Sequence, residues 1–298
     1  MFKKILIIGC GLIGSSILRA IKHKRLSKKI FIFEKSKKNI SKIKKFKSNS
    51  KFIKSINKEI YDVDLVIIST PMSEYKKIIQ KLNNTLKPNA LITDVGSTKQ
   101  NTIKLKNKNL SKKIHWILSH PIAGSEVSGP EYGNKNLFSN KWCVIIKERG
   151  QNLKKLNLIK KFWKKLGSKV VLMNANDHDN IFSITSHLPH LIAYNLIKTA
   201  QDSEKIQRKN LIQYSAGGLR DFSRIAASNE VMWRDIFFSN DNIIKSINLF
   251  TKNLNTFKKI IKNKNNKKLL SRLSNSKKAR KKIVKLKQDI AKPDFGRE

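Results

Sequence analysis

The sequence is 298 residues long and 39% hydrophobic, which is enough to bury a core in each of two domains. Lys and Arg number 64 against 20 Asp and Glu, and a net charge of +44 ordinarily indicates a nucleic-acid or anionic-membrane partner. The excess is nearly all lysine and is spread along the chain with abundant Asn and Ile, residues that share A-rich codons. We therefore interpret it as a solvated surface and expect no nucleic-acid partner.

The two cysteines, Cys10 and Cys143, lie in separate apolar segments and make neither a disulfide framework nor a metal-binding pattern. A reducing cytoplasm is the simplest setting for such a chain. Basic residues before the apolar run 5–10 resemble a secretory signal, but the same run also predicts a first strand. The longest charge-free stretch, 181–197, contains Ser, His and Pro and is too polar for a membrane span.

The amino-terminal segment predicts a strand, a glycine-rich turn and a helix. A β-branched run at 5–8 precedes the pattern GCGLIG, and an amphipathic stretch follows over residues 15–24. The glycines permit a tight turn, approach of a pyrophosphate to amides at the helix start, and close packing of helix on strand. The predicted dinucleotide site comprises Gly9, Gly11, Leu12, Ile13 and Gly14.

The second predicted strand, 30–33, ends in Glu34, twenty residues beyond Gly14. A carboxylate there accepts hydrogen bonds from the adenosine ribose and repels a 2′-phosphate, which favours NAD over NADP. Lysines follow at once and keep NADP open, and a solvated strand end is the alternative for Glu34.

Strands and helices continue to alternate through the first half of the chain. Predicted strands cover 64–69, 90–93, 114–118, 142–146 and 169–172, and predicted helices cover 73–82, 99–106 and 153–166. The pattern predicts an α/β, Rossmann-type doubly wound sheet. Ser69, Thr70 and Pro71 end one of its strands and are expected at the cofactor.

Beyond residue 173, apolar spacing of three and four residues replaces the strand pattern. It dominates residues 181–197, 211–227, 231–238, 243–261 and 269–290. We therefore predict two domains, a dinucleotide-binding domain at 1–173 and an all-helical domain at 174–298.

The segment 119–129, SHPIAGSEVSG, combines His120, Glu126, a proline and two glycines, and predicts a loop after the strand 114–118. Open parallel sheets bind ligands at the carboxyl ends of their strands, so His120 is a candidate site residue. The alternative is a histidine held by backbone in a tight turn. Asp94 and Ser97 follow another strand end, and either enter the same crevice or cap the next helix.

Polar residues also interrupt the amphipathic patterns of the second half. Arg224 and Trp233 suit an acidic organic substrate, because a guanidinium forms paired hydrogen bonds with a carboxylate. The alternative is that the arginine forms an ion pair with a neighbouring aspartate and that the tryptophan belongs to the core. His187 and His190 lack a third or fourth metal ligand in sequence, so no metal is predicted.

The chain resembles the prephenate/arogenate (cyclohexadienyl) dehydrogenases of the TyrA family. The resemblance rests on the motifs GCGLIGSS, DVGSTK, SHPIAGSEVSG, SHLPH, GGLRDFSRIA and MWRDI, in that order. It implies NAD-dependent oxidative decarboxylation of prephenate to 4-hydroxyphenylpyruvate, of arogenate to tyrosine, or of both, in tyrosine biosynthesis. It also implies a homodimer formed through the helical domain.

The resemblance further implies roles for individual residues. His120 accepts the hydrogen bond of the substrate hydroxyl, and Ser97 bonds the same hydroxyl or the imidazole. Arg224 grips a substrate carboxylate, and Glu126 gates or orients the pocket. The other substrate-binding residues implied are His190, Trp233 and Gly218.

A function of another class remains as an alternative: a basic Rossmann-fold protein that senses nucleotides or binds nucleic acid without turnover. Residues 251–298, with 17 Lys or Arg against 3 Asp or Glu, favour it. The leucine and isoleucine spacing of this tail, however, is more typical of a docked helix pair with a solvated lysine face.

Overall fold

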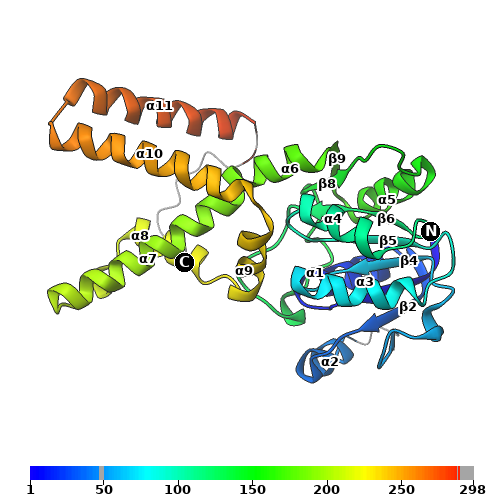
Figure 1. Ribbon diagram of the computed structural model, residues 1–298. Coiled ribbons are helices and arrows are strands. Elements are labelled where there is room, and N and C mark those ends of the chain that lie inside the picture. Colours follow the sequence, from blue (N-terminus) through cyan, green and yellow to red (C-terminus); the bar gives the residue numbers. More distant parts are fainter. Residues whose placement is uncertain (47–49, 287, 289–298) are drawn as a thin grey trace.

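The computed structural model describes residues 1–46, 50–286 and 288. An α/β half carries the amino-terminal residues, and a helical half extends away from it (Figure 1). Within the described residues, none of the helices combines the length and the apolar character that spanning a bilayer requires.

The main sheet has six parallel strands in the order β3-β2-β1-β4-β5-β6. Its strands are β1 (Phe2–Ile8), β2 (Ser27–Phe33), β3 (Lys51–Phe52), β4 (Leu65–Ile68), β5 (Leu91–Asp94) and β6 (His115–Ile117). The strand order reverses between β1 and β4, which opens a crevice at their carboxyl ends. The predicted Rossmann-type sheet is confirmed, although the two-residue strand β3 was not predicted.

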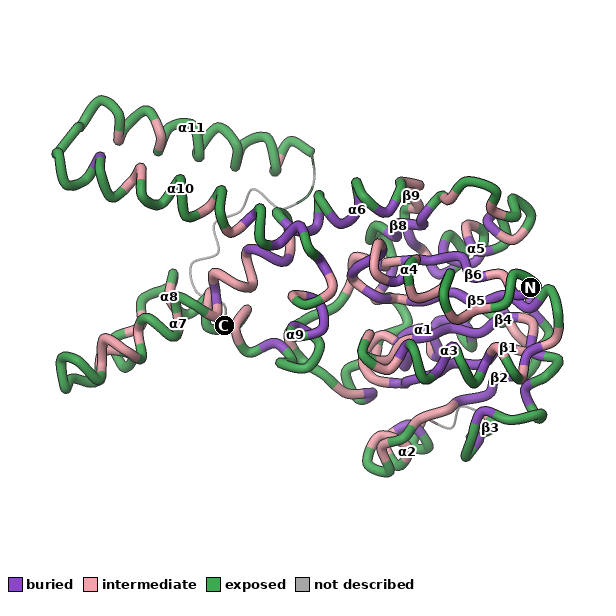
Figure 2. Tube along the Cα trace, viewed as in Figure 1, coloured by how far each residue is buried: buried purple, intermediate pink, exposed green. Residues whose placement is uncertain are grey.

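Helices cover both faces of this sheet. They are α1 (Leu12–His23), α2 (Lys37–Lys44), α3 (Tyr75–Asn83), α4 (Gln100–Asn109) and α5 (Leu153–Leu166). Alternate residues of β1 enter two different cores, Ile5 and Ile7 in the core that contains Trp163, Leu6 and Ile8 in the core that contains Ile79. The central strands of the sheet are mostly buried (Figure 2). Burial on both faces explains the uninterrupted apolar runs of the strands.

A second sheet carries the predicted loop. It contains β7 (Ser119–Pro121), antiparallel to β8 (Trp142–Ile146), which is parallel to β9 (Lys169–Met173). The loop prediction was wrong for residues 119–121, because β7 is an edge strand and Pro121 needs no second neighbour there. Residues 122–129 do lack regular structure.

The helical half begins directly after β9. Its helices are α6 (Ala175–Phe182), α7 (Leu188–Gln207), α8 (Gly217–Ala226), α9 (Glu230–Ser239), α10 (Asn242–Lys262) and α11 (Asn266–Lys285). A π-helical turn, Ser183–His187, joins α6 to α7, and short 3-10 turns cover Lys58–Ile60, Met72–Glu74, Pro130–Tyr132 and Ile212–Tyr214. The predicted helix over 211–227 was wrong in its first turns, since α8 starts at Gly217. The predicted end at residue 290 lies outside the described residues.

A buried ion pair joins the two sheets. Lys99 Nζ lies 2.7 Å from Asp94 Oδ2, and both side chains are fully buried. The same ammonium donates to the carbonyl of Ser119 at 2.6 Å, while Asp94 Oδ1 accepts from the amide of Ser119 at 3.2 Å. The pair therefore holds both backbone groups of the residue that precedes His120. Asp94 is not the cap of α4, whose first amides donate to another acid.

We predict that Lys99→Met lowers the free energy of unfolding by about 3–5 kcal/mol, because it leaves a buried carboxylate without its countercharge. Urea unfolding at pH 7 measures the change. The matched control is Lys198→Met, whose exposed pair with Asp202 is expected to contribute less than about 1 kcal/mol. Equal losses in the two variants would contradict the structural role of Lys99.

Candidate active site

The glycine-rich turn after β1 forms a close-fitting cradle. Gly9 has φ +79°, and a Cβ there would lie 2.7 Å from Thr70 Cγ2. A Cβ on Gly14 would lie 2.3 Å from the carbonyl oxygen of Gly9. In the part of the chain that the structure describes, nothing lies within 4 Å of the position a Cβ would take on Gly11, so this side of the turn is open to a ligand. Ser69 Oγ donates to the Gly9 carbonyl at 2.6 Å, so Ser69 and Thr70, two of the three predicted residues after β4, meet this turn.

Two groups at this crevice lack protein partners. Among the described residues, no side chain caps the start of α1 at Gly11, so the first-turn amides, including those of Leu12 and Ile13, face outward at the positive end of the helix. Thr70 Oγ1 is buried and has no hydrogen-bond partner in the described part of the chain. Amides and a hydroxyl suit a diphosphate, so the residues present fit a dinucleotide. Pro71 follows and precedes a 3-10 turn.

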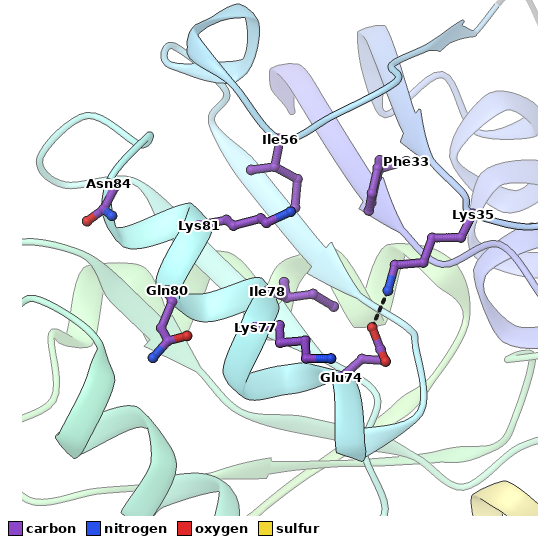
Figure 3. Close-up of a pocket in the computed structure, with 9 residues that line it drawn as sticks. All are labelled: Phe33, Lys35, Ile56, Glu74, Lys77, Ile78, Gln80, Lys81 and Asn84. Atoms are coloured by element: carbon purple, nitrogen blue, oxygen red, sulfur yellow. Dashed lines mark hydrogen bonds and ion pairs between the residues drawn. The ribbon is translucent and has the colours of Figure 1, made fainter.

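Glu34 lies against the cradle rather than in solvent. Its Oε2 accepts from the amide of Cys10 at 2.8 Å and its Oε1 from the amide of Ser36 at 2.9 Å. Each carboxylate oxygen has a second lone pair for a ribose hydroxyl. Beside it, a cleft of about 280 Å³ is lined by apolar Phe33, Ile56 and Ile78 and by the ion pair of Lys35 with Glu74 (Figure 3).

His120 lies on β7 opposite Val144, and the loop that follows β7 reaches the cradle. A Cβ added to Gly124 would lie 3.8 Å from Ile13 Cδ1, which places this loop beside the start of α1. The imidazole of His120 packs edge-on to Phe182 at 5.0 Å. Its Nδ1 lies 2.8 Å from Nε2 of His178 on α6, a contact between the two halves of the chain.

His178 and its neighbour Asp179 were missed by sequence reasoning. His178 Nδ1 lies 2.7 Å from Asp179 Oδ1, and both side chains are buried. The Asp179 carboxylate also accepts from the amides of Lys99 at 2.9 Å and Gln100 at 2.8 Å, at the start of α4. No motif spacing marked them; the available signal was a polar run, NDHDN, in an otherwise amphipathic segment.

Burial keeps these histidines neutral. Desolvation lowers the pKa of His120 well below its usual 6.5, and the nearby charge of Lys99 lowers it further. Burial also lowers the pKa of His178, against the opposing effect of Asp179, and lowers that of His187 to about 4. A neutral imidazole accepts a hydrogen bond from a hydroxyl, which an imidazolium cannot do.

Stacked aromatic side chains lie in the helical half. The ring of His190 stacks on Trp233, with centroids 3.8 Å apart and planes at 23°, and its Nδ1 lies 2.9 Å from the Ser186 carbonyl oxygen. Trp233 is buried, as the core alternative proposed, yet its Nε1 has no partner in the described part of the chain. His187 Nε2 is likewise buried and unpaired among those residues.

Arg224 of α8 reaches across to the loop of His120. Its Nη1 lies 3.4 Å from Glu126 Oε2, and both side chains are partly exposed. The proposed ion pair with a neighbouring aspartate is formed instead by Arg234, whose Nη2 lies 2.7 Å from Asp235 Oδ1. Arg224 and Glu126 therefore lie together at an accessible position between the two halves.

Two predicted residues are not joined to this group. Ser97 is half-buried in the turn before α4, and its hydroxyl forms no hydrogen bond within residues 1–46 and 50–286. Gly218 is exposed in the first turn of α8, with open space where a Cβ would lie. Their roles stay predictions. Among the described residues, no group of three or more His, Cys, Asp or Glu is arranged to hold a metal ion.

The sequence is similar to known proteins over both halves. Residues 17–172 match the nucleotide-binding domain of prephenate dehydrogenase, and residues 174–275 match its dimerization domain. The cyclohexadienyl dehydrogenase of Zymomonas mobilis is 32% identical over 281 residues, which cover 94% of this chain and 96% of that protein. The prephenate dehydrogenase of Lactococcus lactis is 33% identical over 255 residues, which cover 85% of this chain and 69% of that protein.

Solved structures agree. The prephenate dehydrogenase from A. aeolicus in complex with hydroxyphenyl propionate and NAD+ superposes with a TM-score of 0.87 at 33% identity, covering 95% of this chain and 99% of that one. The arogenate dehydrogenase of Synechocystis, 24% identical, shares the fold with a TM-score of 0.77. With the glycine cradle and His120 placed as described, these matches show that the chain belongs to the prephenate dehydrogenase family.

Proposed function

We propose that this enzyme catalyses the NAD-dependent oxidative decarboxylation of prephenate, arogenate or both, with His120 as the acceptor for the substrate hydroxyl. The observation that carries the proposal is the position of His120: a neutral imidazole, anchored through Nδ1, on strand β7, whose following loop lies beside the dinucleotide cradle. The A. aeolicus relative binds NAD+ and hydroxyphenyl propionate, an aromatic acid.

NAD fits the amides at the start of α1, the hydroxyl of Thr70 and the carboxylate of Glu34. The apolar cleft beside Lys35 would suit an adenine ring, and Glu74 pairs with Lys35 and neutralises its charge next to Glu34 (Figure 3). Glu34 then favours NAD over NADP, because its charge repels a 2′-phosphate. When bound, the nicotinamide takes a hydride from the ring carbon that carries the hydroxyl.

His120 supports this step by accepting the hydroxyl hydrogen bond as positive charge develops on the ring. Loss of the ring carboxylate as carbon dioxide supplies the electron pair that makes the ring aromatic. Arg224 holds a second carboxylate of the substrate in place of Glu126, and Trp233 with His190 forms the flat wall of the pocket. Ser97 and Gly218 complete the proposed site.

The chain divides at residues 173/174 in this proposal, between β9 and α6. We further propose a homodimer, supported by the dimerization-domain match and by exposed apolar side chains on α10 and α11: Leu249, Leu254, Ile261, Leu270 and Leu273, each more than half exposed. Two buried free cysteines support a reducing, cytoplasmic location.

Purified protein supplied with NAD and either prephenate or arogenate is expected to form NADH and carbon dioxide. His120→Asn should lower kcat at least about 100-fold, since it removes the hydroxyl's acceptor, while the KM changes little. Steady-state NADH absorbance measures both constants.

Folded, NAD-binding protein that converts neither substrate would refute the proposed function. An equal effect of His120→Asn on kcat and on substrate affinity would refute the role of His120.

Arg224→Ala is expected to raise KM for the substrate by about 10- to 100-fold, because it removes a charge-assisted hydrogen bond to a carboxylate. Arg220→Ala, a neighbour on the same helix, serves as the control and should leave KM nearly unchanged. An unchanged KM in Arg224→Ala would place Arg224 outside the pocket.

The pH profile follows from the lowered pKa of His120. A lowered pKa means that the neutral, hydrogen-bond-accepting form persists below pH 6.5, so kcat/KM should stay level from pH 8 to 6.5 and fall only at lower pH. Initial rates between pH 5 and 9 test this. An acid limb centred above 6.5 would contradict it.

A further inference from the structure

We infer that His178 and Asp179 are positioning residues that fix the tautomer of His120, with hydrogen on Nδ1 and a free lone pair on Nε2. For its role in the reaction, the inference rests on the proposed function. The three side chains form a continuous chain of hydrogen bonds that links β7 to α6 and ends at the start of α4.

The hydrogen positions follow from Asp179. An ionised carboxylate only accepts hydrogen bonds, and this one already accepts from the amides of Lys99 and Gln100. The atom 2.7 Å from its Oδ1, Nδ1 of His178, must therefore carry a hydrogen. Since burial lowers the pKa of His178, its ring is neutral and its Nε2 holds a lone pair.

The same reasoning extends to His120. Its Nδ1 lies 2.8 Å from the lone pair on His178 Nε2, so it must be the donor. A neutral imidazole has one hydrogen, and that of His120 is thus placed on Nδ1. Nε2 of His120 is left as a bare acceptor, the atom that a substrate hydroxyl requires.

Other charged and titratable groups near His120 form hydrogen bonds with groups other than His120. Lys99 Nζ donates to Asp94 and to the Ser119 carbonyl. His187 accepts through Nδ1 from Asn240, whose amide also donates to the Asp179 carbonyl. The hydrogen-bonding direction of His120 Nδ1 is therefore set by His178.

The chain also stabilises charge during the reaction. When the substrate O–H bond breaks and the proton forms a bond to His120 Nε2, the ring becomes an imidazolium. Its Nδ1 hydrogen then strengthens its bond to His178, and the developing charge is balanced through that ring by the Asp179 carboxylate. The hydride leaves for NAD, the electron pair of the carboxylate bond closes the aromatic ring, and the proton returns to the phenol oxygen.

Nitrogen-15 NMR of histidine-labelled protein reads the tautomers without any turnover. In the wild type at pH 7.5, we expect both His120 and His178 to carry hydrogen on Nδ1, with assignments from single histidine substitutions. A His120 ring protonated on Nε2 would overturn the inference.

Activity supplies the second test. His178→Phe removes the acceptor for His120 Nδ1, and we expect kcat to fall roughly 100-fold, with KM and the Kd for NAD within about threefold of wild type. His178→Gln places an amide oxygen where Nε2 was, and should recover at least about tenfold of that loss. His115→Phe is the matched control, because His115 lies on β6 and pairs with Asn89, away from the site.

The inference is overturned if His178→Phe lowers kcat no more than His115→Phe, or if it weakens kcat and binding equally, as a purely structural residue would. Should His178→Phe fail to fold, the glutamine variant and the wild-type spectra still decide. If the wild type converts neither substrate, the proposed function fails, while the NMR result separately establishes or refutes the tautomer.

Discussion

The structure depends on one buried lysine. Lys99 neutralises Asp94 through its ammonium, holds the carbonyl of Ser119, and donates its own amide to Asp179. It therefore links the main sheet, the strand that carries His120 and the first helix of the second half. An isolated buried charge is costly, so the pair persists only in the arrangement that satisfies both partners. That arrangement is also the one that places His120 between the cradle and the helices.

Neither half of the chain builds the site alone. The α/β half supplies the cradle, Glu34 and the strand that carries His120, whereas the helical half supplies His178, Arg224 and the stacked pair of His190 with Trp233. Several of the cross-contacts are hydrogen bonds of the buried side chains of His178 and Asp179, which require specific geometry. The groups of the proposed site are consequently positioned by packing across the boundary rather than by local loop structure.

Sequence reasoning predicted most of the fold because local rules govern it: apolar runs made the strands, and Gly9 and Gly14 of the fingerprint lie at close approaches of other chain segments. The site was predicted less completely. Glu34, His120 and Arg224 stand in motifs. The hydrogen-bond partner of His120, however, is His178, 58 residues away in the sequence, and the acid at the start of α4 is Asp179, 80 residues from Lys99. Pairing at such separations depends on tertiary packing, as does the edge-strand character of residues 119–121, which turn chemistry alone assigned to a loop.

The π-helical turn at Ser183–His187 sets how far α7 is rotated about the helix axis relative to α6. An α-helix advances about 100° per residue, so the extra residue in this turn shifts α7 by that amount relative to α6. His178 precedes the shift and faces the sheet, whereas His190 follows it and faces Trp233. One added residue thus lets a continuous helical rod place His178 against His120 at one end and His190 against Trp233 at the other.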